Sequence, residues 1–323
     1  MARALAGPLG AGLARLSAAA WEGRRKLYEL GVRVPERVSA RVVSIGNLTV
    51  GGAGKTTLCL HLAARALERG AEPAVVARRY RPGPGGRGDE EQLYRAALGD
   101  ARVFAGSSKL ASARAAAAAG AKLVLVDDGF SHWPLERDLD IVLVDRTDPW
   151  GGGRLLPAGR LREPMRALQR AGIVVVTRLA ASEDPGPWLE EMSRRAPAAR
   201  VAAARHAVSG VRDLAGARLH PDGAARVLTA TGNPAAVAAS AGEAGYAPVD
   251  LAAYRDHHWW TLAEARREHA AAHAGTLLLT EKDAVRWPAD APRARVAVLE
   301  TRWHWLRNGD QVERAVFEPD DEA

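Results

Sequence analysis

The sequence has few features that would place it across a membrane or in an oxidising compartment. Cys59 is the only cysteine in 323 residues, so no disulfide can form within the chain, and a reducing compartment fits this composition. No stretch of about 18 uncharged apolar residues is present, which argues against a membrane-spanning helix. There is no internal repeat, and the length suits one large domain or two ordinary ones.

The charge balance is basic. The chain carries 45 Lys and Arg against 38 Asp and Glu, a net charge of +7. This excess favours an anionic partner, which could be a nucleotide, a nucleic acid or an acidic membrane surface. Charge alone does not choose among the three.

A glycine-dense turn within residues 41–62 is the first candidate site. A short apolar run precedes it, and an amphipathic helix follows it. Turns of this kind hold phosphate groups, because successive backbone N–H groups and the N-terminal end of the helix face the anion. The residues predicted to bind nucleotide are Thr49, Val50, Gly51, Gly52, Ala53, Gly54, Lys55, Thr56 and Thr57.

Two side chains of this turn have expected roles. Lys55 would reach the β- and γ-phosphates of ATP and support catalysis, and the Thr56 hydroxyl would bind Mg²⁺. The usual spacing places a glycine six residues before the lysine, where this chain has Thr49. The alternative is a glycine-rich turn without a ligand.

A second metal-binding element follows the apolar run 122–126. Asp127 and Asp128 come directly after that predicted strand. A carboxylate at the end of a strand beside a phosphate loop holds Mg²⁺, so both residues are predicted metal ligands together with Thr56.

Further apolar runs, alternating with helical segments, predict the fold. They occur at 73–77, 141–144 and 173–177, and they favour an α/β, P-loop NTPase-type, doubly wound and mostly parallel sheet. A second, smaller α/β lobe is predicted from strands at 226–230, 276–280 and 295–299 and helices at 234–243 and 261–273. The expected domains are an N-terminal segment (1–33), a kinase-type core (34–208), the smaller lobe (209–300) and a C-terminal segment that could pack back on the core (301–323).

The N-terminal segment is predicted to be an amphipathic helix. Arg24, Arg25, Lys26 and Arg33 gather at one end of it. This pattern is typical of a helix lying in a membrane interface, but a surface helix packed on its own domain is an equal alternative. The apolar stripe comprises Leu9, Leu13, Leu16, Ala20, Leu27 and Leu30.

Three classes of phosphate-loop protein are candidates for this chain. Dimeric partitioning ATPases have a lysine where this chain has Val50, and GTPases need an N-K-x-D motif that is absent. The third class is a small-molecule or lipid kinase. The Gly- and Pro-rich stretch 82–91 is either a lid over the ligand or a solvated linker.

Eight segments together resemble the tetraacyldisaccharide 4′-kinases, the lipid A 4′-kinases. In order they are GNLTVGGAGKTT, the Arg78/Tyr80 cluster, Gly88-Asp89-Glu90, VDDGFSHWPLERDLDIVLVD, GGGRLLPAGRLREP, TGNP, the Asp256-His257 pair and TEKDAV. The resemblance covers residues 15 to about 300. It implies a monotopic enzyme at the cytoplasmic face of the bacterial inner membrane that transfers the γ-phosphoryl of ATP to the 4′-hydroxyl of an acylated glucosamine disaccharide lipid. No nucleic acid and no obligate protein partner is expected. A regulatory or partner-loading ATPase or GTPase is the alternative.

The resemblance also assigns the acceptor chemistry. Asp89 falls at the position of the proposed general base and His257 at that of its partner histidine. A sugar hydroxyl needs such a base, because its proton must leave as the bond to phosphorus forms. With Asp89 and His257 on different predicted domains, we expect them to meet only when the domains close. The alternative for His257 and His258 is a metal site or a surface turn.

The chain departs from the family pattern at several positions. The family usually has glycine at positions 79 and 81, proline at 91, glutamine at 131 and asparagine at 152. Replacing two glycines by arginine changes the backbone freedom of a loop expected to approach the ligand. The residues present here are Arg79, Arg81, Glu91, Ser131 and Gly152.

Overall fold

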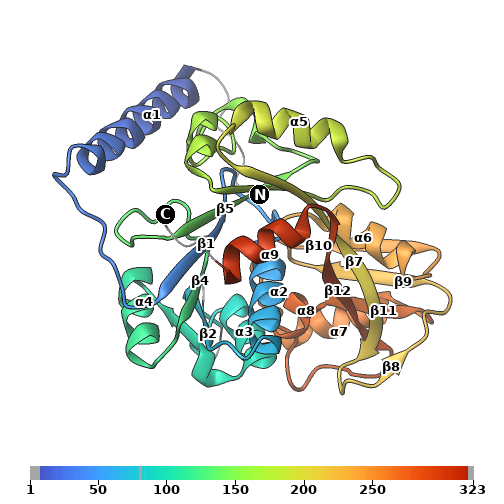
Figure 1. The fold of residues 1–323 in the computed structure, drawn as a ribbon. Helices are drawn as coiled ribbons and strands as arrows, with labels where there is room; N and C mark the ends of the chain where they lie inside the picture. The colour runs from blue at the N-terminus through green and yellow to red at the C-terminus, as the bar shows by residue number, and fades with distance from the viewer. Residues whose placement is uncertain (1–7, 80–81, 84, 319–323) are drawn as a thin grey trace. The chain divides into compact units, whose positions relative to one another are not determined.

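The computed structural model describes residues 8–79, 82–83 and 85–318. The chain divides into two compact units, and we describe each by itself (Figure 1). The larger unit contains the described residues up to Arg78, Leu98–Arg205 and those from Trp303 onward. The smaller unit contains the described residues of Arg79–Ala97 and His206–Arg302. The chain therefore enters the smaller unit twice.

The larger unit is built on a parallel sheet with the strand order β3-β2-β4-β1-β5-β6-β7. Its strands are short apolar runs buried on both faces, and in β4 no side chain from Leu123 to Val126 is more than 5% exposed. The strands are β1 (Arg41–Asn47), β2 (Pro73–Arg78), β3 (Val103–Gly106), β4 (Leu123–Asp127), β5 (Leu139–Asp145), β6 (Ile173–Thr177) and β7 (Arg200–Asp213).

Helices of the larger unit pack on this sheet. Helix α2 lies on β1, β2 and β4, because its apolar side chains face one side, and α4 lies on β2, β3 and β4. Helix α9 is tied to α2, since Glu313 accepts a hydrogen bond from Arg65 Nε (3.1 Å) and contacts His61 Nε2 (3.0 Å). The helices are α1 (Pro8–Glu29), α2 (Lys55–Glu68), α4 (Lys109–Ala118), α5 (Gly186–Arg195) and α9 (Gly309–Phe317).

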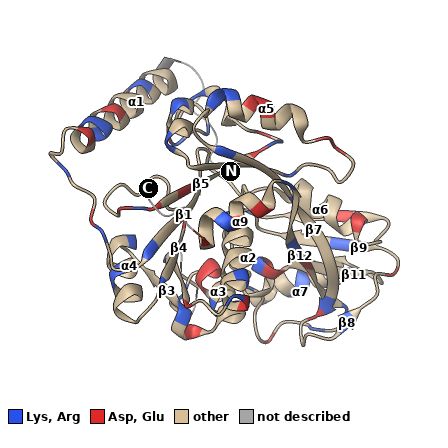
Figure 2. Ribbon diagram, in the orientation of Figure 1, with Lys and Arg blue, Asp and Glu red and all other residues tan. Residues whose placement is uncertain are grey.

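Helix α1 packs on its own unit along one face only. Trp21 is 9% exposed, and its indole N–H donates to Glu163 Oε2 (2.9 Å). Trp21 and Tyr28 both contact the ring of Trp133. Basic residues also occur in this helix (Figure 2). A different face carries exposed leucines, namely Leu9, Leu13, Leu16 and Leu27.

The smaller unit has a parallel sheet with the order β10-β9-β11-β12. The later residues of β7 enter this unit and pair with β8 in an antiparallel hairpin. The strands are β8 (Arg218–Leu219), β9 (Ala225–Thr229), β10 (Val249–Ala253), β11 (Thr276–Thr280) and β12 (Val296–Arg307). The helices are α3 (Asp89–Leu98), α6 (Pro234–Glu243), α7 (Leu262–Ala271) and α8 (Glu281–Ala284).

The predicted α/β class with a mostly parallel sheet is confirmed. The structure differs from the sequence-based prediction in several features, two of which concern the segment around α3. The stretch 82–91 does not remain a loop to its end, since α3 begins at Asp89. Residues 79 and 85–97 belong to the smaller unit rather than to the core domain, because Asp89 and Glu90 pair with side chains of that unit.

Candidate active site

The phosphate loop lies between β1 and α2. Its predicted nucleotide-binding residues, Thr49 to Thr57, form one continuous turn that leads into the first turn of the helix. Gly51 and Gly54 have φ angles of 136° and 99°, which only glycine adopts readily. Because α2 begins at Lys55, the unpaired N–H groups of its first turn are available to an anion at this loop.

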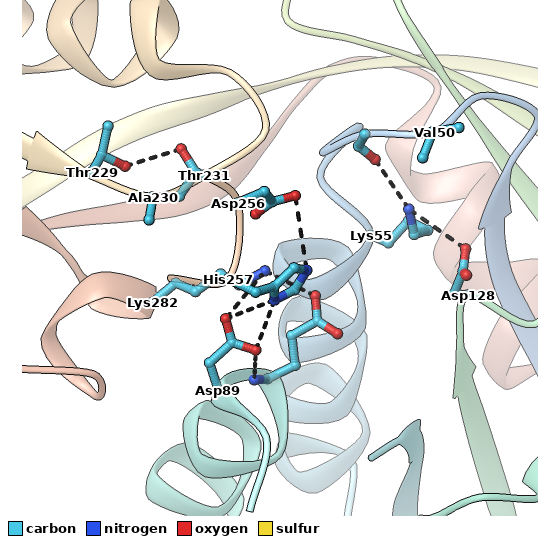
Figure 3. A network of polar contacts seen from close by, with 12 residues as sticks. Val50, Lys55, Asp89, Asp128, Thr229, Ala230, Thr231, Asp256, His257 and Lys282 are labelled. Carbon is cyan, nitrogen blue, oxygen red and sulfur yellow. Dashed lines mark hydrogen bonds and ion pairs between the residues drawn. The ribbon is translucent and has the colours of Figure 1, made fainter. Parts of the chain in front are cut away.

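Lys55 lies across the loop towards Asp128, which with Asp127 forms the Walker-B pair at the end of β4. Its Nζ donates to Asn47 Oδ1 at 2.9 Å and lies 3.4 Å from Gly51 O. The same atom lies 3.6 Å from Asp128 Oδ1 (Figure 3). The side chain is 15% exposed. The predicted phosphate-binding lysine and one predicted metal-binding carboxylate are therefore brought together.

Asp127 is the last residue of β4 and is buried, and Asp128 follows it directly. Asp127 is opposite Ile45 in the register of β4 with β1, and Asp128 has a left-handed φ of 54°. Arg162 donates to both oxygens of Asp128, at 2.6 and 2.7 Å. Burial alone would raise the pKa of Asp128, but the charges of Lys55 and Arg162 hold this pKa well below its usual range.

Thr56, Asp127 and Asp128 offer a hydroxyl and carboxylate oxygens, the ligand type that Mg²⁺ prefers. Mg²⁺ usually keeps several waters and takes one or two carboxylates, so this small donor set fits it. Among the residues described by the structure, no three His, Cys, Asp or Glu side chains are grouped to hold a metal ion. The alternative of a metal site at His257 and His258 thus gains no support.

Two arginines hold backbone carbonyls of the phosphate loop. Arg160 Nη2 donates to Val50 O at 2.8 Å, and Arg178 donates to Gly52 O. Each arginine is itself paired, Arg160 with an aspartate at 148 (2.7 Å) and Arg178 with one at 145 (2.9 Å). These contacts restrict the loop conformation in a stretch that glycine leaves flexible.

Asp89 and His257 form a hydrogen-bonded pair within the smaller unit. His257 Nδ1 donates to Asp89 Oδ2 at 2.9 Å and lies 3.1 Å from Oδ1 (Figure 3). Its Nε2 is 3.8 Å from Asp256 Oδ2. The expectation that the pair meets only on domain closure is wrong, because α3 belongs to the same unit as His257.

Two cations support this pair. Lys282 Nζ lies 3.0 Å from Glu90 Oε1 and 3.7 Å from Asp89 Oδ2, and Arg286 Nη1 lies 3.5 Å from Asp89 Oδ2. Burial alone would raise the pKa of Asp89, but the hydrogen bond from His257 and the charges of Lys282 and Arg286 hold it well below its usual range. Asp89 is therefore a carboxylate at neutral pH.

Sequence reasoning missed Arg162 and Arg286. Arg162 lies in the LREP segment, which carried part of the family resemblance, and it could have been assigned from that motif. Arg286 stands three residues after Asp283, a spacing that places both side chains on one helical face. Neither position shows from the sequence alone which carboxylate it serves.

The departures from the family pattern have partial explanations. Arg79 and Glu91 form an ion pair with each other at 3.1 Å, so each of these two replacements supplies the partner for the charge of the other. Gly152 has a φ of 79°, a left-handed conformation that glycine adopts readily and asparagine more often than most other residues. The Oγ of Ser131 is buried without a hydrogen-bond partner in the described part of the chain. Tyr80 and Arg81 lie outside the described residues.

His132 follows the Walker-B segment and is neutral at physiological pH. Burial, with the charges of Lys109 and Arg137, lowers the pKa of His132 to about 4. Lys109 itself donates to the backbone carbonyl of Asp128, so a further cation lies beside the Walker-B pair.

Comparisons with known proteins cover nearly the whole chain. A family model described as tetraacyldisaccharide-1-P 4′-kinase matches residues 8–317. A tetraacyldisaccharide 4′-kinase of Anaeromyxobacter sp. (strain Fw109-5) is 36% identical over 335 residues, covering 95% of this chain and 89% of that protein. One of Halorhodospira halophila is 35% identical over 284 residues, covering 84% and 80%. The crystal structure of the "apo" form of LpxK from Aquifex aeolicus, in complex with ATP, matches 95% of this chain and 96% of that one with a TM-score of 0.69; at 19% identity, this likeness shows the fold.

Proposed function

The chain belongs to the tetraacyldisaccharide-1-P 4′-kinase family, the lipid A 4′-kinases, and we propose that Asp89 is the general base for transfer of the γ-phosphoryl of ATP to the 4′-hydroxyl of an acylated glucosamine disaccharide 1-phosphate. The observation that carries this proposal is the contact of 2.9 Å between Asp89 Oδ2 and His257 Nδ1. A buried carboxylate that is both ionised and oriented by an imidazole is suited to accept a proton.

The larger unit binds the phosphate donor. The backbone N–H groups of the loop and the start of α2 surround the phosphates, and Lys55 neutralises charge on the transferred group. Thr56, Asp127 and Asp128 would hold Mg²⁺, which when bound offsets the negative charge of the triphosphate. Arg162 keeps Asp128 ionised and oriented next to Lys55.

The smaller unit supplies the base for the acceptor. As the 4′-oxygen bonds to the γ-phosphorus, the bond from phosphorus to the β,γ-bridging oxygen breaks, and the hydroxyl proton passes to Asp89. His257 donates to the same carboxylate and fixes its orientation. General bases of this kind typically contribute about 10²–10⁴ to the rate.

We assign the protein to the cytoplasmic face of the bacterial inner membrane as a peripheral enzyme. No helix in the described part of the chain is long and apolar enough to cross a membrane. Helix α1 instead exposes leucines at Leu9, Leu13 and Leu16, while basic residues such as Arg24 and Lys26 lie further along it. An apolar face with nearby cations favours insertion among anionic headgroups.

Phosphoryl transfer from labelled ATP to the lipid tests this function. The purified protein is incubated with γ-labelled ATP and Mg²⁺, with and without detergent-dispersed tetraacyldisaccharide 1-phosphate, and the label on lipid and on free phosphate is counted. We expect label on the lipid, with little hydrolysis in its absence. Lipid-independent hydrolysis with no labelled lipid would instead favour a regulatory ATPase.

Substitution of Asp89 tests the assignment of the base. Asp89→Asn should lower kcat about 10²–10⁴-fold while the affinity for ATP stays nearly unchanged, because proton acceptance is separate from nucleotide binding. Asp222→Asn, at an exposed position of the same unit, is the matched control. If ATP affinity collapsed instead, Asp89 would belong to the nucleotide or metal site.

A further inference from the structure

Arg286 is the largest fully buried side chain among the described residues. It is 2% exposed. A guanidinium cannot lose its charge inside a protein, so its burial is tolerated only where acceptors surround it. Arg286 is not one of the residues that the proposed reaction uses directly, so this burial needs another explanation.

The acceptors around Arg286 come from three directions. Its Nη2 donates to Asp283, and its Nε donates to Lys282 O at 3.2 Å. Its Nη1 donates to Ala230 O at 3.1 Å and forms the ion pair with Asp89 Oδ2 at 3.5 Å. One guanidinium fork therefore contacts the carboxylate of the base, the residue that follows β9, and helix α8, which precedes Arg286 in the chain.

Ala230 connects this arginine to the histidine of the pair. Its carbonyl accepts a hydrogen bond from the backbone N–H of His257 (3.2 Å) as well as from Arg286. Its own N–H donates to Asp283 Oδ1 at 3.0 Å. Asp283 is completed by Thr280, whose hydroxyl donates to Oδ2 at 2.7 Å. Arg286, Ala230 and Asp283 are thus joined in a ring of hydrogen bonds, which we call the Arg286 circuit, and both oxygens of Asp283 accept a hydrogen bond.

The Arg286 circuit is bonded through Ala230 to His257, whose backbone conformation is unfavourable. His257 has a φ of 61°, which is unfavourable for a residue with a Cβ atom and persists only when its surroundings enforce it. The hydrogen bond from its N–H to Ala230 O is one such constraint. The side chain of His257 reaches Asp89 from this backbone position, so the geometry of the pair depends on Ala230.

We propose that Arg286 is a positioning residue for the reaction, and that it holds Asp89 and His257 in their reactive arrangement by binding Asp89 and Ala230 at once. This inference rests on the proposed role of Asp89 as base. Arg286 does not touch the substrate in this mechanism. Its task is to place the carboxylate and, through Ala230, the imidazole.

Charged groups near Asp89 come from three segments of the chain. Lys282 and Arg286 come from α8 and the turn after it, His257 and Asp256 from the segment after β10, and Glu90 from α3 itself. Lys282 is shared between Asp89 and Glu90, whereas the three other acceptors of Arg286 lie in its own local circuit. Loss of Arg286 therefore removes a contact that Lys282 cannot replace, because Lys282 has no bond to Ala230.

A double-mutant cycle between Asp89 and Arg286 tests the proposal. The variants are Arg286→Met, which keeps the length of the side chain without its charge, Asp89→Asn and the double variant. For each, kcat and the KM for ATP and for detergent-dispersed lipid are measured in the full-length protein, and the unfolding midpoint is recorded in urea. Arg226→Met is the control, because it removes a half-buried arginine of the same unit that pairs with Glu268 and Asp250.

If Arg286 acts through Asp89, the two effects are not additive. We expect Arg286→Met to lower kcat by up to about 10²-fold, as misplacement of a catalytic group does, with the KM for ATP little changed. In the Asp89→Asn background the same substitution should cost no further activity. Arg226→Met should leave kcat nearly unchanged. A merely structural role would lower the residual activity of Asp89→Asn as well, and that result would overturn the proposal.

Two further outcomes are distinguishable. Full kcat in Arg286→Met would also overturn the positioning role. Full kcat in Asp89→Asn would refute the base itself, and with it everything that rests on the base. If Arg286→Met does not fold, Arg286→Lys serves in the same cycle, because it keeps the charge but loses the guanidinium fork. Its kcat should lie between those of the parent protein and Asp89→Asn. In the Asp89→Asn background, Arg286→Lys should cause no further loss of kcat.

Discussion

Replacing Leu9 and Leu16 by serine should release the protein from lipid vesicles without changing its turnover of detergent-dispersed lipid. The two side chains are 71% and 66% exposed and stand seven residues apart, on one face of α1. Trp21 and Tyr28, which pack inward, lie on a different face. The substitutions thus change the outer surface of the helix and leave its packing intact.

The magnitude follows from the exposed fraction. Full burial of a leucine side chain contributes about 1.5–3 kcal/mol, so two side chains that are about 70% exposed would contribute about 2–4 kcal/mol on entering the interface. Since 1.4 kcal/mol is a factor of ten, the partition coefficient should fall by roughly 30-fold or more. The lower end of this range is the better expectation, because an interfacial helix inserts only partly.

Sedimentation with vesicles of mixed neutral and anionic lipid measures this coefficient. A variant with serine at Leu219 and Leu251, which are 38% and 39% exposed in the smaller unit, controls for general loss of surface hydrophobicity and should bind as the parent protein does. Trp21→Phe removes the hydrogen bond to Glu163 and should lower stability by about 1 kcal/mol without releasing the protein. Unchanged sedimentation of the Leu9/Leu16 variant would refute membrane binding by this face.

Two further predictions concern the larger unit. Lys55→Ala should lower kcat by about 10²–10³-fold in the lipid phosphorylation assay, because a charge aimed at the transferred phosphate is lost. Lys122→Ala, at an exposed site, is the control and should have no effect. A fully active Lys55→Ala would contradict the phosphate-loop assignment. Gly46→Ala should lower the free energy of unfolding by about 1–3 kcal/mol in urea titrations, because the added Cβ would lie 2.4 Å from the Cβ of Phe130. Gly12→Ala, which has open space around it, is the control and should not destabilise the protein. Equal unfolding midpoints for the two variants would argue against this packing.

Five strands of the larger unit (β1, β2, β4, β5 and β6) could be predicted because each is a local feature, whereas β3 and β7 were missed. The runs 123–126, 141–144 and 173–176 are continuously apolar, and a strand buried on both faces needs no other signal. Strand β10 (Val249–Ala253) was missed for the opposite reason. It pairs with a single neighbour at the end of the sheet, and its half-exposed side chains show no apolar run.

The site residues, too, could be predicted where they are close in sequence and not where they are far apart. The phosphate loop is contiguous in sequence, so its chemistry could be read from Thr49 to Thr57 directly. The pairing of Asp89 with Arg286 joins residues 197 positions apart, and no spacing rule connects them. The order of elements along the chain even pointed away from it, because α3 stands between two strands of the larger unit but belongs to the smaller one.

The two ionised carboxylates, Asp128 and Asp89, differ in a way that fits their separate tasks. Both oxygens of Asp128 accept short, charge-assisted bonds from Arg162, at 2.6 and 2.7 Å, and a carboxylate bound in this way is a poor proton acceptor. The cations near Asp89 lie 3.5 and 3.7 Å away, beyond good hydrogen-bond distance, and its hydrogen bonds come from His257 and the backbone N–H of Glu90 (2.8 Å). Asp89 is thus kept ionised by the hydrogen bond from His257 and, over longer distances, by the charges of Lys282 and Arg286. Among the side chains that the structure describes, Asp89 has no permanently charged donor at such a short distance, so its oxygens are better placed than those of Asp128 to accept a proton.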